Sequence, residues 1–113
     1  MSKKTFALDA AYGAHPNPGV FLKPFFCKDD TDGLINNAEI TIIPGFEILP
    51  HSHPNSTEFF YVVSGEGEIK DDAGTHKIKP GDGFRALPGV VHSLTVTGNE
   101  PLRIFATFAP PIM

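Results

Sequence analysis

The chain has 113 residues, a formal net charge of −4 at pH 7 and 9 basic residues that are scattered along it. This length is typical of one domain with one hydrophobic core. The acidic balance argues against a nucleic-acid-binding surface. No stretch approaches the roughly 20 apolar residues that a membrane-spanning helix requires. From the charge and from this absence, respectively, we expect neither nucleic acid nor a membrane as a partner.

The N-terminus and the cysteine content indicate where the protein works. Asp9 and Tyr12 interrupt the apolar run that a secretory signal would need after the basic opening. Cys27 is the only cysteine, so no intramolecular disulfide can form and stability must come from packing. We therefore expect a cytoplasmic protein.

Glycine and proline divide the chain into short apolar runs. There are 11 glycines and 11 prolines, and no run of a dozen residues has sustained helical spacing of apolar positions. Short runs at even spacing, separated by turn residues, are typical of a β-sandwich or barrel. We predict an all-β fold with strands at residues 39–43, 46–53, 58–63, 67–70, 75–78, 83–87, 92–97 and 102–109.

The first 35 residues are less regular. Asn17-Pro18-Gly19 and Lys23-Pro24 break the pattern, yet Val20, Phe21 and their neighbours are too apolar to stay in water. We expect residues 1–35 to form an N-terminal arm or an added strand, and residues 36–113 to form the barrel of a single domain.

Two segments that contain histidine supply the residues for a predicted metal site. Side chains alternate along a strand, so His51 and His53 are expected on one face. Glu58 leads the next strand after a turn, and His92 opens another strand after a Pro-Gly turn. Three imidazoles and one carboxylate can bind one divalent transition metal ion per chain and leave coordination positions open. The net +1 charge of such a site would favour an anionic small-molecule substrate.

The spacing of these residues resembles the first motif of the cupin superfamily. That motif is glycine, five residues, His-x-His, four residues, glutamate, six residues and glycine. Gly45, His51, His53, Glu58 and Gly65 match it without a deviation.

A second cupin motif is matched less completely. Gly81, Gly89 and His92 stand at the expected positions, whereas Leu87 replaces a proline and Val96 replaces an asparagine. These departures affect the turn and leave the histidine in place. The resemblance covers roughly residues 36 to 109.

The resemblance implies a small single-domain cupin of the conserved-barrel, cupin 2 type, which is a double-stranded β-helix or jelly-roll barrel. It also implies that the metal ligands are His51, His53, Glu58 and His92. The metal stays open among iron, manganese, nickel, cobalt, copper and zinc. Small single-barrel cupins commonly form homodimers, and the apolar N-terminal segment could cross to a partner.

Strand parity suggests which side chains surround the predicted metal. Tyr61 and Arg85 are the best polar candidates for positioning a substrate, although a bulge would move either to the other face. His15 and His76 have no partners in the sequence pattern, so no role is expected for them. The expected apolar wall comprises Phe60, Val62, Leu94 and Val96, with Phe84, Leu102, Ile104 and Phe108 as further members or as ordinary core.

Three functions are compatible with this ligand set. The leading hypothesis is a metal-dependent, dioxygenase-like oxidoreductase that acts on a small organic acid or a phenolic compound. The second is a non-redox isomerase, lyase or cyclase in which the metal is only a Lewis acid. The third is a non-catalytic ligand-binding or sensing barrel. The same ligands accept several metals, so the sequence leaves the choice open.

Overall fold

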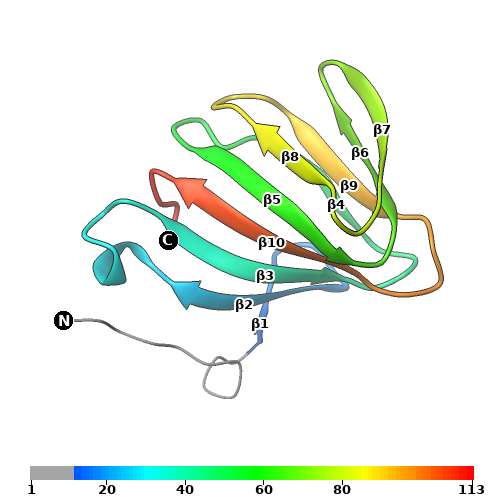
Figure 1. Cartoon of the computed structure of the whole chain (residues 1–113), viewed down its shortest axis with the longest axis horizontal. Helices are drawn as coiled ribbons and strands as arrows, with labels where there is room; N and C mark the ends of the chain where they lie inside the picture. Colours follow the sequence, from blue (N-terminus) through cyan, green and yellow to red (C-terminus); the bar gives the residue numbers. More distant parts are fainter. Residues whose placement is uncertain (1–11) are drawn as a thin grey trace.

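The computed structural model describes residues 12–113, which form an almost entirely β structure (Figure 1). The helix within this range is a single 3-10 turn, η1, and no helix there is long and apolar enough to cross a bilayer. The prediction of an all-β fold is confirmed. The elements are β1 (Gly13–Ala14), β2 (Val20–Phe26), η1 (Lys28–Asp30), β3 (Asn36–Ile42), β4 (Glu47–His51), β5 (Thr57–Ser64), β6 (Gly67–Asp71), β7 (Gly74–Ile78), β8 (Gly83–Ala86), β9 (His92–Val96) and β10 (Leu102–Ala109).

The strands make two antiparallel sheets that face each other. The larger sheet has six strands in the order β1-β2-β3-β10-β5-β8, and the smaller has four in the order β4-β9-β6-β7 (Figure 1). From β3 onward the chain passes repeatedly from one sheet to the other, which is the connectivity of a jelly roll. Residues at the ends of strands from both sheets are thereby brought to the same end of the barrel.

All eight predicted strands are present as β3 to β10, with differences at their ends. The strand predicted at 39–43 begins three residues earlier, at Asn36, because β10 pairs with β3 as far as Phe108 opposite Asn36. Asparagine has a low strand propensity, so only this tertiary pairing places Asn36 in a strand. The strand predicted at 46–53 ends at His51, which leaves His53 in the following turn.

The N-terminal segment lies on the edge of the larger sheet. Val20 of β2 pairs with Ile42 of β3 and is buried, and Leu22 packs against the core. Pro24 is tolerated because β1 pairs only with Phe21 and Leu22, so no neighbour on that side needs its missing N–H. The expectation that concerns residues 1–11 lies outside the described part of the chain.

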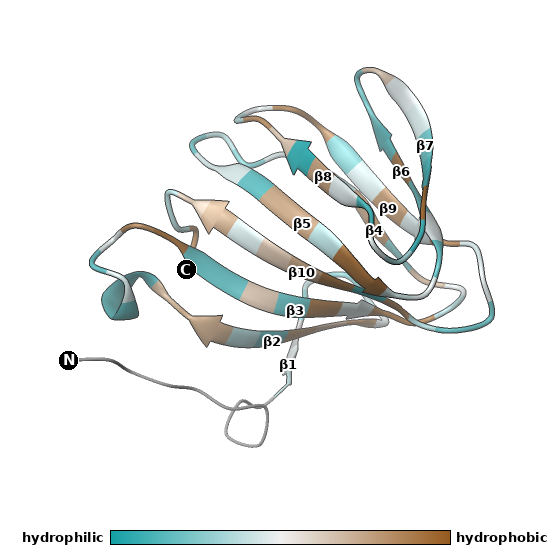
Figure 2. Ribbon diagram, viewed as in Figure 1, coloured by the Kyte–Doolittle hydropathy of each residue, from teal (hydrophilic) through white to brown (hydrophobic). Residues whose placement is uncertain are grey.

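The core fills the space between the sheets. Along β5, Phe60 and Val62 point inward with Glu58, whereas Phe59 and Tyr61 point outward. In Figure 2 hydrophilic and hydrophobic residues alternate along much of β3, as expected for a strand with one face in the core. Burying a large apolar side chain contributes about 1.5–3 kcal/mol, so these residues supply the main stabilisation. The core comprises Val20, Ile40, Ile42, Ile48, Phe60, Val62, Ile69, Ile78, Leu94, Leu102, Ile104, Ala106 and Phe108.

The turn between β5 and β6 depends on Gly65, and we predict that Gly65→Ala is strongly destabilising. Gly65 has φ +81°, and an added Cβ would collide with the carbonyl oxygen of Pro101. Gly33 is a matched control because it has φ +76° with nothing within 4 Å of an added Cβ. Urea unfolding should show a loss of about 1 kcal/mol for Gly33→Ala from the backbone conformation alone, and at least about twice that for Gly65→Ala. Equal losses would contradict the role of the close approach.

Candidate metal centre

Four side chains meet at one end of the barrel. His51 is the last residue of β4, His53 lies in the β4–β5 turn, Glu58 is the second residue of β5, and His92 is the first residue of β9. Because β4 and β9 belong to the smaller sheet and β5 belongs to the larger one, the cluster joins the two sheets. The structure brings together all four residues that the sequence selected as metal ligands.

A bulge in β4 turns His51 into the cluster. Ile48 pairs with Leu94 and His51 pairs with His92, so β4 has one residue more than β9 between these two pairs. Ile48 and His51 are three residues apart and would lie on opposite faces of a regular strand. The extra residue reverses the parity, so both side chains line the same cavity. The expectation that His51 and His53 share a face of one regular strand is wrong, because the bulge and the turn bring them together instead.

The donor atoms are close enough to share one ion. One nitrogen from each histidine and one carboxylate oxygen of Glu58 all lie within 4.8 Å of one another. The Nε2 atoms of His53 and His92 are 3.3 Å and 3.0 Å from Oε1 of Glu58. Two ligands on opposite sides of one ion, each about 2.1 Å from it, are about 4.2 Å apart. Small side-chain movements therefore suffice for coordination.

Backbone carbonyls orient two of the imidazoles. Nδ1 of His51 is 2.9 Å from the carbonyl oxygen of Leu49, and Nδ1 of His92 is 3.0 Å from that of Val90. A carbonyl only accepts hydrogen bonds, so Nδ1 carries the proton and Nε2 of the neutral ring keeps its lone pair. This is the arrangement in which a histidine presents Nε2 to a metal while its other nitrogen holds the ring in place.

The environment keeps Glu58 ionised. Burial alone raises the pKa of this carboxyl group, but hydrogen bonds and charge interactions with His53 and His92 outweigh that effect and lower the pKa to about 2. Burial also lowers the pKa of His92, yet the Glu58 carboxylate more than compensates and the net shift is upward. Burial lowers the pKa of His51, and the neighbouring histidines lower it further. The carboxylate is thus charged over the whole physiological pH range.

The donor set fits a cation. The lone pair of neutral His92 Nε2 would face a carboxylate oxygen at 3.0 Å, and two acceptors at that distance require a proton or a cation between them. Nε2 of His53 is buried 3.3 Å from the same carboxylate oxygen, but it makes no well-aligned hydrogen bond within the described chain, and a buried polar atom without a good hydrogen bond is costly. A divalent ion would satisfy both groups. The cluster could therefore hold one transition metal ion.

A small cavity lies beside the cluster. Its volume is about 90 Å³, and most of the residues that line it are apolar. Leu94 and Phe108, which were expected in the wall, do line it. Phe60 and Val62 belong to the core instead, and Val96 packs against that core. The lining residues are His15, Leu22, Asn36, Ala38, Ile40, Ile48, His51, His53, Glu58, Leu94, Phe108, Ile112 and Met113.

Several of these wall residues were missed by sequence reasoning. His15 and Leu22 come from the N-terminal segment, and Ile112 and Met113 come from the C-terminal tail. The tail is held in place because the backbone N–H of Ile112 donates a hydrogen bond to Oδ1 of Asn36 at 2.7 Å. No local spacing in the sequence relates these residues to the histidine motif, so no signal could have found them.

The two polar positioning candidates lie away from the cluster. Tyr61 is 54% exposed and has the opposite strand parity to Glu58. Arg85 pairs with Phe59 and is exposed on the same outer face of the larger sheet. The structure therefore does not bring Tyr61 or Arg85 to the cavity. His76 is exposed on β7, where Nε2 is 3.1 Å from Oδ1 of Asp71.

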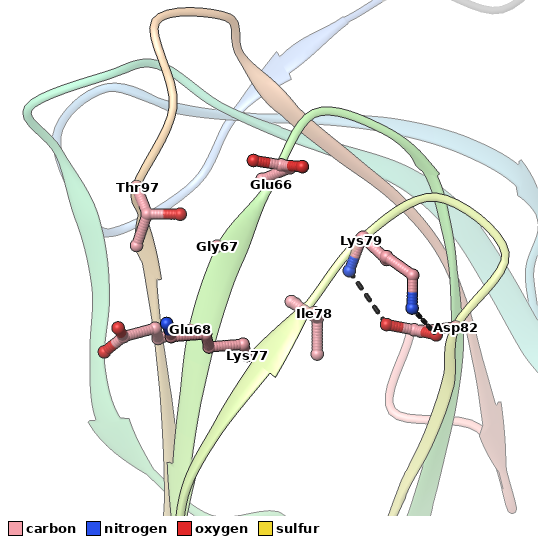
Figure 3. A pocket seen from close by; sticks show the side chains of 8 residues that line it. All are labelled: Glu66, Gly67, Glu68, Lys77, Ile78, Lys79, Asp82 and Thr97. Atoms are coloured by element: carbon pink, nitrogen blue, oxygen red, sulfur yellow. Dashed lines mark hydrogen bonds and ion pairs between the residues drawn. The ribbon is translucent and has the colours of Figure 1, made fainter.

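A second hollow lies at the far end of β6 and β9 from His92 (Figure 3). Charged side chains of Glu66, Glu68, Lys77, Lys79 and Asp82 border it, and Lys79 Nζ lies 3.7 Å from Asp82 Oδ1. Lys79 and Asp82 form an exposed ion pair, and such pairs are weak. This hollow has no histidine or cysteine in its lining and is not a comparable metal site.

The fold and the four-residue cluster define a small β-barrel that is competent to bind a metal. The chain belongs to the cupin family, since the model of the cupin domain matches residues 38–108, which is more than half of the chain. The resemblance noted in the sequence is confirmed, and so is the small single-domain cupin fold.

Known relatives place the chain among small cupins. An uncharacterised protein of Methanocaldococcus jannaschii is 28% identical over 102 residues, which cover 80% of this chain and 82% of that protein. An oxalate-binding protein of Thermotoga maritima is 33% identical over 69 residues, which cover 61% of this chain and 57% of that protein. The crystal structure of a predicted oxalate decarboxylase from Thermotoga maritima superposes with a TM-score of 0.80 at 25% identity, and the match covers 89% of this chain and 91% of that one.

We predict that His53→Ala lowers metal affinity at least about tenfold, because it removes a donor atom from the cluster. His76→Ala is the matched control, since it removes an exposed imidazole on β7. Elemental analysis after dialysis against a weak chelator measures the difference. The fold should survive in both variants because the barrel has its own apolar core. Equal metal retention in the two variants would contradict the ligand assignment.

Proposed function

We propose that this protein is a metal-dependent enzyme that acts on a small organic acid, and that His51, His53, Glu58 and His92 are its metal ligands. The observation that carries the proposal is the half-buried cluster of three imidazoles and one carboxylate beside a mostly apolar cavity. A divalent iron, manganese, nickel, cobalt, copper or zinc ion held there would supply a Lewis acid, and with iron, manganese, cobalt, nickel or copper also redox chemistry. The divalent ion, the Glu58 carboxylate and the three neutral imidazoles would together have a net charge of +1, which favours binding of an anionic substrate oxygen.

The size of the cavity favours a short acid over a phenolic compound. The cavity volume is about 90 Å³. An apolar cavity of about 150 Å³ is known to accommodate benzene, so an aromatic ring would have to displace part of the wall. The chain's own residues would bind the carboxylate at the cluster and exclude water with Ile48, Leu94 and Phe108.

Oxygenation is the reaction that we propose. Most of the cavity lining is apolar, and dioxygen is a small apolar molecule that such a lining can accommodate. His51, His53, Glu58 and His92 would hold the ion, and a redox-active ion bound there would supply the electron-transfer chemistry that oxygenation needs. The likeness to an oxalate-binding protein supports a small acid as the ligand and carries no information about dioxygen.

We predict that iron-loaded protein consumes dioxygen when a short 2-oxo acid or hydroxy acid is added, and that His53→Ala abolishes this consumption. An oxygen electrode measures the rate over a panel of acids and phenols, with the His76→Ala protein as a matched control. Oxygen uptake at the same rate in His53→Ala would mean that free iron is responsible. Absence of uptake over the panel would contradict oxygenase activity.

The same experiment distinguishes two other functions. Consumption of an acid without oxygen uptake, supported equally by zinc, would indicate a lyase, an isomerase or a cyclase. The relative described as a predicted oxalate decarboxylase favours the lyase among these. Recovery of a tightly bound acid that is chemically unchanged would indicate a ligand-binding or sensing barrel, which the relative described as oxalate-binding favours. The cytoplasmic location stays a prediction that rests on the single cysteine.

A homodimer also stays a prediction, and we propose a contact surface for it. Residues 20–26 pair with β3 of the same chain, so they are not free to cross to a partner. The outer face of the larger sheet exposes Phe59, Tyr61, Val63 and Phe105 on the two adjacent strands β5 and β10. Arg103 and Glu39, whose side chains are 3.5 Å apart, give the border of this face both signs of charge. In a two-fold dimer, the apolar centre of this face could pack against the same centre of a second copy, and the charges of opposite sign at the border could pair.

We predict that Tyr61→Lys converts the dimer to a monomer, because it places a charge in the middle of this apolar face. Leu34→Lys is the control, since Leu34 is 70% exposed in the loop before β3. Light scattering after size-exclusion chromatography measures the mass. A monomeric native protein, or an unchanged dimer in Tyr61→Lys, would contradict this surface.

A further inference from the structure

His15 stands in the wall of the cluster cavity although it lies outside both histidine motifs. It precedes β2, and its backbone N–H donates a hydrogen bond to the carbonyl oxygen of Val20 at 3.2 Å, which fixes the turn that carries it. Its side chain is half-buried and lines the cavity together with His51, His53 and Glu58. The position is therefore built by the N-terminal segment and not by the barrel motifs.

Asn17 fixes the tautomer of this imidazole. The backbone N–H of Asn17 donates to Nδ1 of His15 at 3.0 Å, and Nδ2 of its side-chain amide is 3.2 Å from the same atom. Oδ1 of Asn17 accepts a hydrogen bond from the backbone N–H of Leu49 at 3.1 Å, which sets the amide with its NH₂ group toward His15. Nδ1 is thus an acceptor, and the proton of the neutral ring is on Nε2.

The neutral ring is the form that the surroundings favour. Burial lowers the pKa of His15, and the negative charge of Glu58 opposes this effect only in part. Within residues 12–113 no acceptor bonds to Nε2 of His15. The N–H group is therefore available to a molecule in the cavity.

We propose that His15 is a ligand-binding residue, whose Nε2–H donates a hydrogen bond to an anionic oxygen of the small organic acid held at the cluster. The inference rests on the proposed function for the presence of that acid. The wall around His15 contains Leu22, Ile48 and Ile112, so the remainder of the acid is a short apolar chain. A hydrogen-bond donor set beside an apolar wall suits a short acid with a small alkyl group, and a 2-oxo acid such as pyruvate has this form.

Pyruvate is the probe for this role, and zinc is the metal because it does not change oxidation state. Isothermal titration calorimetry of zinc-loaded protein with pyruvate should show that His15→Phe weakens binding about tenfold or more. The substitution removes the hydrogen bond to a charged oxygen but keeps an aromatic ring at this position. His76→Phe is the matched control and should bind pyruvate like the native protein. His15→Gln places an amide N–H near the position of Nε2 and should recover part of the affinity, which a purely structural role of His15 would not predict.

Nitrogen-15 NMR of the histidine side chains gives a second readout that does not depend on the metal. The native protein should show Nδ1 of His15 without a proton and Nε2 with one, and pyruvate should shift the Nε2–H resonance. Equal pyruvate affinity in His15→Phe and native protein at equal zinc content would overturn the proposal. So would a proton on Nδ1, or absence of pyruvate binding to the native protein.

Failure of the proposed function would look different. If the native protein retained no zinc, the metal assignment would fall, and the resonance of His15 would still show whether pyruvate reaches the ring. If zinc were retained equally in native protein and His15→Phe and both bound pyruvate alike, only the role of His15 would fall.

Discussion

The buried carboxylate of Glu58 is the group on which the arrangement of this end of the barrel depends. It is 3% exposed and remains ionised because Nε2 atoms of His53 and His92 lie 3.3 Å and 3.0 Å from one of its oxygens. An isolated buried charge would be costly, so the histidines must stay where they are. Since Glu58 belongs to the larger sheet and His92 to the smaller, the electrostatics of the cluster and the packing of the two sheets depend on each other.

The backbone makes this convergence possible through an irregularity. A regular β4 would point His51 away from the cavity that Ile48 enters, and the extra residue between them corrects this. Leu49 and Pro50 occupy the bulge, and the missing N–H of Pro50 favours a break in the ladder at that point. The carbonyl of Leu49, released from regular pairing, accepts the hydrogen bond from His51. One local distortion therefore supplies both the direction and the orientation of the ring.

The N-terminal and C-terminal segments supply part of the wall of the cavity beside the cluster. The N-terminal segment brings His15 and Leu22 to the cavity, and the C-terminal tail brings Ile112 and Met113. Barrel strands alone would leave the cluster more open to water, which would weaken its electrostatic interactions.

Local patterns in the chain were enough to predict the class of fold, the eight strands from β3 to β10 and the four residues of the cluster. This was possible because alternation, turn chemistry and motif spacing are local properties of a chain. Three outcomes could not be predicted in this way: His53 lies outside the strand, Tyr61 and Arg85 face outward, and His15 lines the cavity. Those outcomes depend on strand register, on a bulge and on contacts between segments distant in sequence, and no local pattern encodes them.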